Sequence, residues 1–134
     1  LKSDFPGLEI VVNGGLKSEN QIAEQLKHVD GAMIGRQACT DPYWLAGLQR
    51  QFVVHGDSGQ IMSREALVHR MAEYAAGHVA NGGRMHQITR HMLGLYAGVP
   101  GAARWRRFLS ENARAAEAGP EILLAALACI DAAA

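Results

Sequence analysis

The hydrophobic pattern at the start of the chain predicts two strands of a parallel sheet. Residues 8–12 are apolar and β-branched apart from one glutamate, which is typical of a strand covered on both faces. A second, shorter apolar run at residues 32–34 predicts the neighbouring strand. The residues that follow these strands are Asn13, Gly14 and Gly15 after the first and Gly35 and Arg36 after the second.

Helix-start signals follow each strand. Ser18 is a good N-cap, and Gln21 three residues later could complete a capping box for a helix over residues 19–28. Asp41 and Pro42 predict the start of another helix that ends near Phe52. The first part of the chain therefore reads as a βαβα unit, in which both strands end at the same edge.

The pattern changes after residue 62, where apolar positions recur only at helical spacing. Residues 53–62 contain two glycines and read as a linker, and Ser63 is a plausible N-cap. The expected helices cover residues 64–80, 85–97, 102–116 and 120–133. Because the links between them are short, we expect antiparallel neighbours in a small bundle. This gives an α/β portion at residues 1–52, a linker at 53–62 and a helical domain at 63–134.

The two glycine-containing strand ends predict a phosphate-binding site. Each motif alone is weak, because glycine after a strand usually serves a turn. Together, at the ends of consecutive parallel strands, they resemble the phosphate site that the last two strands of a (β/α)8 barrel often build. Exposed backbone N–H groups and the forked guanidinium of Arg36 would bind the anion.

Charge is balanced over the whole chain but not along it. The chain has 13 basic and 13 acidic residues, yet residues 84–114 contain six arginines and one acid, Glu111, a net charge of +5. The arginines are Arg84, Arg90, Arg104, Arg106, Arg107 and Arg114. A solvated helix face with internal ion pairs is the simple alternative, but it lacks the acids it needs. Nucleic acid binding is therefore favoured.

Other residues limit the possible chemistry. Cys39 and Cys129 lie far apart, without metal-ligand or disulfide spacing, which favours a reducing cytoplasm. Cys39 is interpreted as a small buried residue rather than a nucleophile. His86 and His91 are five apart, a poor spacing for metal ligands on a helix, so no metal is expected. No apolar run reaches the roughly 20 residues of a membrane span.

Several segments together resemble the C-terminal part of tRNA-dihydrouridine synthases. They are IVVNGGLKS, VDGAMIGRQA followed by DPYWLA, and HQITRHMLGLYAGVPGAARWRRFLSENA. The last run resembles the A-type branch of that family, and the resemblance covers about residues 4–130. Since the chain also opens without methionine, we expect a C-terminal fragment of a longer protein.

The resemblance implies an FMN-binding (β/α)8 TIM barrel followed by a C-terminal helical bundle domain that binds tRNA. Such an enzyme, a cytoplasmic monomer, reduces uridine in the D-loop at position 20/20a to dihydrouridine and uses NADPH to recharge the flavin. The FMN phosphate would be held by Asn13, Gly14, Gly15, Gly35 and Arg36. The arginines expected to contact tRNA are Arg90, Arg104, Arg106 and Arg107.

The resemblance does not extend to the family's chemistry. The family's catalytic cysteine protonates the uracil ring from a mid-barrel loop motif, and neither Cys39 nor Cys129 matches that motif. No catalytic residue is therefore expected within these 134 residues. Two alternatives remain, a flavin barrel acting on a small molecule and a non-enzymatic RNA-binding module. The first gives no reason for the arginines, and the second gives none for the glycine motifs.

Overall fold

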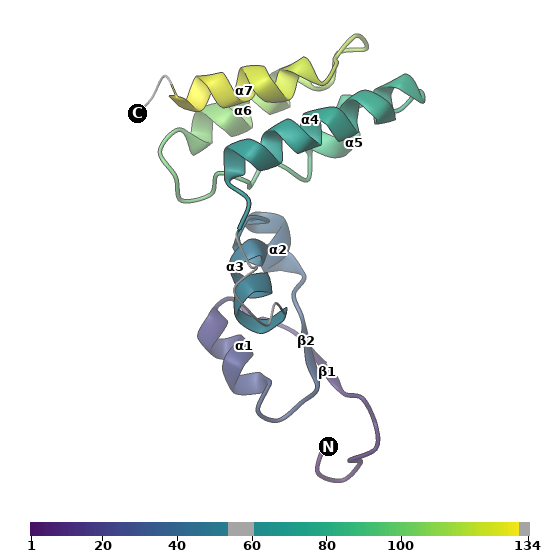
Figure 1. The fold of residues 1–134 in the computed structure, drawn as a ribbon, viewed down its shortest axis with the longest axis vertical. Helices are drawn as coiled ribbons and strands as arrows, with labels where there is room; N and C mark the ends of the chain where they lie inside the picture. Colours follow the sequence, from purple (N-terminus) through teal and green to yellow (C-terminus); the bar gives the residue numbers. More distant parts are fainter. Residues whose placement is uncertain (54–60, 132–134) are drawn as a thin grey trace. The chain divides into compact units, whose positions relative to one another are not determined.

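The computed structural model describes residues 1–53 and 61–131, and these form two compact units, Leu1–Cys39 and Thr40–Ala134 (Figure 1). The first unit contains both strands, β1 (Val11–Asn13) and β2 (Gly31–Met33), with helix α1 (Glu19–Gln25) between them. The strands pair in parallel, with Val11 opposite Gly31 and Asn13 opposite Met33. The predicted βαβ unit is therefore present. The predicted linker lies mostly outside the described residues.

Both strands are shifted by one to three residues from the expected positions. Residues 8–10 do not join the ladder, because side chains and a loop bind their backbone groups instead. The Lys2 ammonium lies 2.7 Å from the carbonyl oxygen of Leu8, and the N–H of Ile10 donates to the Asp30 carboxylate over 2.8 Å.

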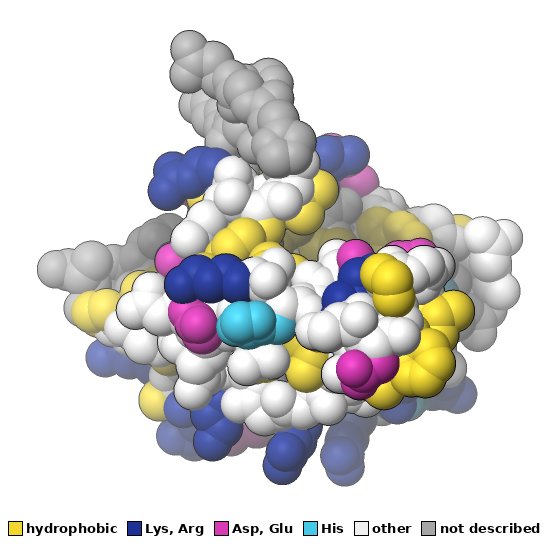
Figure 2. Space-filling model, turned by 90° about the horizontal axis from the view of Figure 1, so that it is seen from below, with side chains coloured by type: hydrophobic (Ala, Val, Ile, Leu, Met, Phe, Trp, Pro, Cys, Tyr) yellow, Lys and Arg dark blue, Asp and Glu magenta, His cyan; other side chains and the backbone are white. Residues whose placement is uncertain are grey.

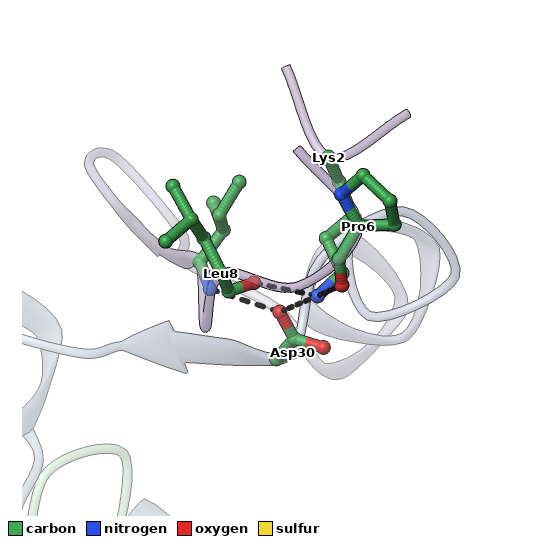
Figure 3. Close-up of polar contacts among 5 residues, drawn as sticks. Lys2, Pro6, Leu8 and Asp30 are labelled. Atoms are coloured by element: carbon green, nitrogen blue, oxygen red, sulfur yellow. Dashed lines mark hydrogen bonds and ion pairs between the residues drawn. The ribbon is translucent and has the colours of Figure 1, made fainter. Parts of the chain in front are cut away.

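Lys2 and Asp30 also pair directly at the amino ends of the strands. Their charged groups lie 2.7 Å apart, and Lys2 donates to the carbonyl of Pro6 as well (Figure 3). The hydrogen bond from Lys2 and the backbone N–H of Ile10 lower the pKa of the Asp30 carboxyl below its ordinary value of 3.8. This cluster ties the start of β1 to the loop before β2.

Helix α1 begins where the sequence predicts it. The Ser18 hydroxyl accepts from the N–H of Gln21, while the Gln21 side chain accepts from the N–H of Lys17 rather than from the N-cap residue. The helix ends at Gln25 and continues as turns to His28, three residues short of the prediction. Short helix α2 (Arg36–Thr40) follows β2 and was not expected.

The second unit is helical throughout its described residues. Asp41 caps the N–H of Trp44 at the start of α3 (Trp44–Leu48), which continues as a π-helical segment, η1 (Gln49–Val53). Helix α4 (Arg64–Ala80) has the predicted bounds, with Ser63 as its N-cap. The remaining helices are α5 (Met85–Thr89), α6 (Ala102–Asn112) and α7 (Glu121–Asp131).

Helix α5 is much shorter than the predicted helix over residues 85–97. Its continuation is a series of turns with i→i−3 hydrogen bonds, such as that from the N–H of Leu95 to the carbonyl of Met92. Two carbonyls in this turn segment also accept hydrogen bonds from side chains. Trp105 Nε1 donates to Met92 over 2.9 Å, and Arg64 Nε donates to Leu95 over 2.8 Å. The turns are therefore fixed by tertiary contacts that local spacing does not reveal.

Trp105 lies at the centre of the helical core. It is fully buried, and its ring centroid lies 4.9 Å from that of Tyr96. Helix α7 contacts both α6 and α4 and contributes the buried side chains of Leu123 and Ala126 (Figure 1). Trp105 and the buried side chains of α7 therefore belong to the same hydrophobic core.

A close contact fixes the start of the second unit to the turn segment. A Cβ on Gly94 would collide with the carbonyl oxygen of Thr40, so only glycine allows this approach. Nearby, the Arg64 guanidinium lies 4.0 Å from the centre of the Tyr43 ring, whose hydroxyl donates to the carbonyl of Met62. Arg64 also donates to the carbonyl of Leu95, so it contacts both Tyr43 and the turn segment after α5.

Replacing Gly94 by alanine should lower the free energy of unfolding by about 1–3 kcal/mol, the usual cost of overpacking. Gly77→Ala is the matched control, since nothing lies within 4 Å of its Cβ position in α4. That change should raise stability by up to about 1 kcal/mol through helix propensity. Urea unfolding of both variants checks this, and equal stability of the two would contradict the close approach.

Asp30→Asn should make stability less dependent on acidic pH. Because the pKa of Asp30 is lowered in the folded state, its charged form stabilises the fold fully above the ordinary value of 3.8. That contribution is lost as the pH falls from there through the lowered pKa. The difference in unfolding free energy between wild type and Asp30→Asn should therefore be constant near neutrality and shrink in acid. A difference that stays constant into strong acid would contradict the assignment.

Candidate functional site

The parallel register brings the two predicted glycine segments to one edge of the sheet. Asn13 ends β1 opposite Met33, which ends β2. The chain therefore leaves both strands at the same edge, first through Gly14 and then through Gly35. This geometry is what the phosphate-site prediction requires, although the ligand itself remains a prediction.

The backbone after β1 is suited to close approach by a ligand. Gly14 has φ +147° and Gly15 has φ +64°, conformations that other residues rarely adopt. A Cβ at either position would meet no atom within 4 Å, so the space beside this backbone is open. Asn13 is also exposed. These residues fit a phosphate group that would contact backbone N–H groups.

The segment after β2 supplies the cation. Arg36 is exposed and is the first residue of α2, directly after Gly35. A Cβ on Gly35 would lie 3.7 Å from the Met33 sulfur, an ordinary contact, so this glycine is not required by packing. Arg36 is thus the charged residue of the candidate phosphate site. Gly14 and Gly15, which follow β1, supply its backbone N–H groups.

The arginines predicted to contact RNA are exposed in the second unit. Arg104, Arg106 and Arg107 lie on α6 beside the buried Trp105, and Arg90 directly follows α5. Their exposure fits a surface contact, and their role in RNA binding remains a prediction.

One of these arginines has an acidic partner. Arg107 Nε lies 2.8 Å from the Glu111 carboxylate one helical turn away, and their side chains are 80% and 58% exposed. The hydrogen bond that Arg107 donates to the Glu111 carboxylate raises the pKa of Arg107. The interpretation that this segment lacks the acids for helix-face ion pairs is therefore wrong at Arg107. An exposed ion pair contributes little stability, so another anion can take the place of the Glu111 carboxylate beside Arg107.

Arg90 is oriented by its neighbour. Its Nε donates to Nε2 of His91 over 2.9 Å, so that ring nitrogen acts as an acceptor in this arrangement. Arg90 also borders a cavity whose other lining residues include Ser110 at the end of α6 and Arg114 just after it. Arg114 and His86 line this cavity but were not predicted as site residues. The spacing of Arg106, Ser110 and Arg114 by four was the available signal.

The cysteines and histidines do not form a further site in the described residues. Cys39 is exposed rather than buried, which corrects its interpretation as a small core residue, and Cys129 is partly buried. In residues 1–53 and 61–131, no group of three or more His, Cys, Asp or Glu side chains could hold a metal ion. Within the same residues, no helix is long and apolar enough to cross a membrane.

Comparison with known proteins matches residues 1–133 to the family model described as dihydrouridine synthase (Dus). A tRNA-dihydrouridine(20/20a) synthase of Shewanella oneidensis is 47% identical over 123 residues, 92% of this chain and 36% of its own length. Relatives with the same name from Pseudomonas syringae pv. tomato and Vibrio cholerae are 48% and 43% identical, covering 92% and 97% of this chain and 36% and 39% of their own lengths.

The chain thus spans a little over a third of the length of these curated relatives, while nearly all of it is matched. The matched residues include both glycine segments and the arginine-rich helices. The resemblance read from the sequence is therefore confirmed, and the chain belongs to the dihydrouridine synthase family.

Proposed function

We propose that this chain forms part of an FMN-dependent enzyme that reduces uridine to dihydrouridine at position 20/20a of tRNA. The observation that carries this proposal is the similarity along nearly the whole chain to relatives named tRNA-dihydrouridine(20/20a) synthase. When bound, FMN supplies the hydride for the uracil ring, and NADPH restores the reduced flavin. The complete enzyme would act as a cytoplasmic monomer.

In this proposal, the first unit holds the phosphate of FMN. Backbone N–H groups of Gly14 and Gly15 and the guanidinium of Arg36 bind its oxygens, with Asn13 and Gly35 shaping the turns. Support comes from the parallel register, the open space beside the two glycines and the exposure of Arg36. Backbone donors together with one forked cation are a common combination at phosphate sites.

The proposed barrel accounts for apolar side chains that the described chain leaves uncovered. Leu8, Val11 and Met33 are 58%, 51% and 46% exposed, although parallel sheets are normally covered on both faces. Figure 2 shows hydrophobic side chains at the surface among charged and polar ones. We propose that residues 1–52 are the last βαβα portion of a (β/α)8 TIM barrel, whose other strands and helices cover these residues.

The helical residues 63–134 would bind tRNA as the second domain. Arg90, Arg104, Arg106 and Arg107 would contact the phosphate backbone and so position the uridine at the flavin. A base inside folded tRNA must be extruded to reach a barrel-bound cofactor, and firm binding of the flanking RNA would offset that cost.

Arg36→Ala in the holoenzyme should lower the fraction of protein that retains FMN, because the phosphate loses its cation. Arg50→Ala is a matched control, since Arg50 is exposed but belongs to η1 and not to the segments that follow the strands. The ratio of flavin to protein absorbance after dialysis measures the effect. Equal FMN retention by the Arg36 variant and wild type would contradict this assignment.

Replacing both Arg106 and Arg107 by alanine should weaken tRNA binding by the complete enzyme and flatten its salt dependence. Each lost phosphate contact should reduce the slope of log affinity against log salt by about one. Arg70→Ala on α4 is the control, because Arg70 is exposed but lies outside residues 84–114. Binding to tRNA and dihydrouridine formation on unmodified tRNA are measured together. A wild-type enzyme that forms no dihydrouridine would contradict the proposed function.

A further inference from the structure

A cavity of about 290 Å³ lies between α5 with its following turn and the C-terminal part of α6. Its apolar floor is formed by Leu93, Leu109 and Ala113. Leu109 and Ala113 are 1% and 3% exposed, so this floor belongs to the packed core and is fixed in place. Trp105 lies one helical turn before Leu109 on α6, and its indole N–H donates to the carbonyl of Met92. The cavity therefore lies directly against the core of the helical unit.

The rim of the cavity is polar and basic. It contains His86, Arg90, Ser110 and Arg114, and no acidic side chain lines it. Arg90 and Arg114 come from different elements, one after α5 and one after α6. Among the residues that the structure describes, neither arginine forms an ion pair with a carboxylate. Two uncompensated guanidinium groups beside a hydroxyl favour a phosphate oxygen.

The combination of an apolar floor with a basic rim matches the chemistry of a nucleotide. A base is flat and weakly polar on its faces, whereas the phosphate of the nucleotide is anionic. A floor of Leu93, Leu109 and Ala113 can contact the first while Arg90 and Arg114 bind the second. A phosphate-only site would have no use for the apolar floor.

The surroundings favour a nucleotide of an RNA chain over a free one. Arg106, Ser110 and Arg114 follow one another at intervals of four, so the basic surface continues from the cavity along α6. Arg106 is exposed there, where it can bind a neighbouring phosphate. A polymer that follows this surface would make several phosphate contacts and place one nucleotide in the cavity.

We propose that this cavity binds a single splayed-out nucleotide of the tRNA, with its phosphate between Arg90 and Arg114 and its base on the apolar floor. This nucleotide is distinct from the uridine that is reduced, and the inference rests on the proposed function. Its binding fixes the register of the tRNA on the helical domain, because an inserted nucleotide cannot slide as a backbone contact can.

Two variants of the complete enzyme test this by different means. Arg114→Ala removes one cation, and Ser110→Phe fills the cavity without changing charge. Both positions are exposed, so the fold should survive. Each variant should weaken tRNA binding about tenfold, the equivalent of one charge-assisted hydrogen bond. Only Arg114→Ala should reduce the salt slope, by about one.

The control places the same aromatic ring elsewhere. Ala76→Phe lies at an exposed position of α4, which contributes nothing to the cavity, and should leave tRNA affinity unchanged. FMN retention and the thermal unfolding midpoint should be equal in all variants. Wild-type tRNA affinity in Ser110→Phe would overturn the proposal.

A free-nucleotide arm separates the two sources of phosphate. If uridine 5′-monophosphate binds wild type and this binding is lost in Ser110→Phe while tRNA affinity is unchanged, the cavity serves a free nucleotide and the proposal is wrong. If wild type binds and modifies tRNA but neither variant matters, the proposed function stands without this site. A wild-type enzyme that does not bind tRNA contradicts both.

Discussion

The buried hydrogen bond from Trp105 to Met92 determines the shape of the helical unit. An indole N–H without an acceptor is costly inside a core, so Trp105 can be buried only where a carbonyl is available. Met92 supplies that carbonyl because the chain there turns instead of continuing as a helix. The same turns place Leu95 within reach of Arg64 and bring Gly94 against Thr40. Packing in the core and the shape of the surface therefore have a common origin.

Local sequence signals predicted the elements whose ends are set by neighbouring residues. Helix α4 has the predicted bounds because Ser63 caps its start and Gly82, with φ +85°, follows its end. Helix α1 begins at the Ser18 cap for the same reason. Helix α5 was predicted too long. The carbonyls of Met92 and Leu95 in the turns after it bind Trp105 and Arg64, which come from distant parts of the sequence.

The candidate sites were predictable to different degrees. Glycine after each strand and the parallel βαβ rule together indicated that Gly14, Gly15, Gly35 and Arg36 lie at one edge, because the register follows from the fold class. The cavity beside Arg90 was not predictable, since it depends on the place where the turns after α5 meet the end of α6. Local periodicity predicted a continuous helix over residues 85–97, whereas α5 ends at Thr89 and turns follow it.

The Arg107–Glu111 pair gives the basic surface two kinds of arginine. Glu111 is a counter-ion tethered to the protein, and from a distance it cancels the charge of Arg107. Among the described residues, Arg104 and Arg106 form no ion pair with a carboxylate, so they contribute more to the long-range positive potential of α6 than Arg107 does. Arg107 remains a cation in this pair, but its charge is balanced by the carboxylate that it contacts. Arginines of the same helix therefore differ in how far their charge acts.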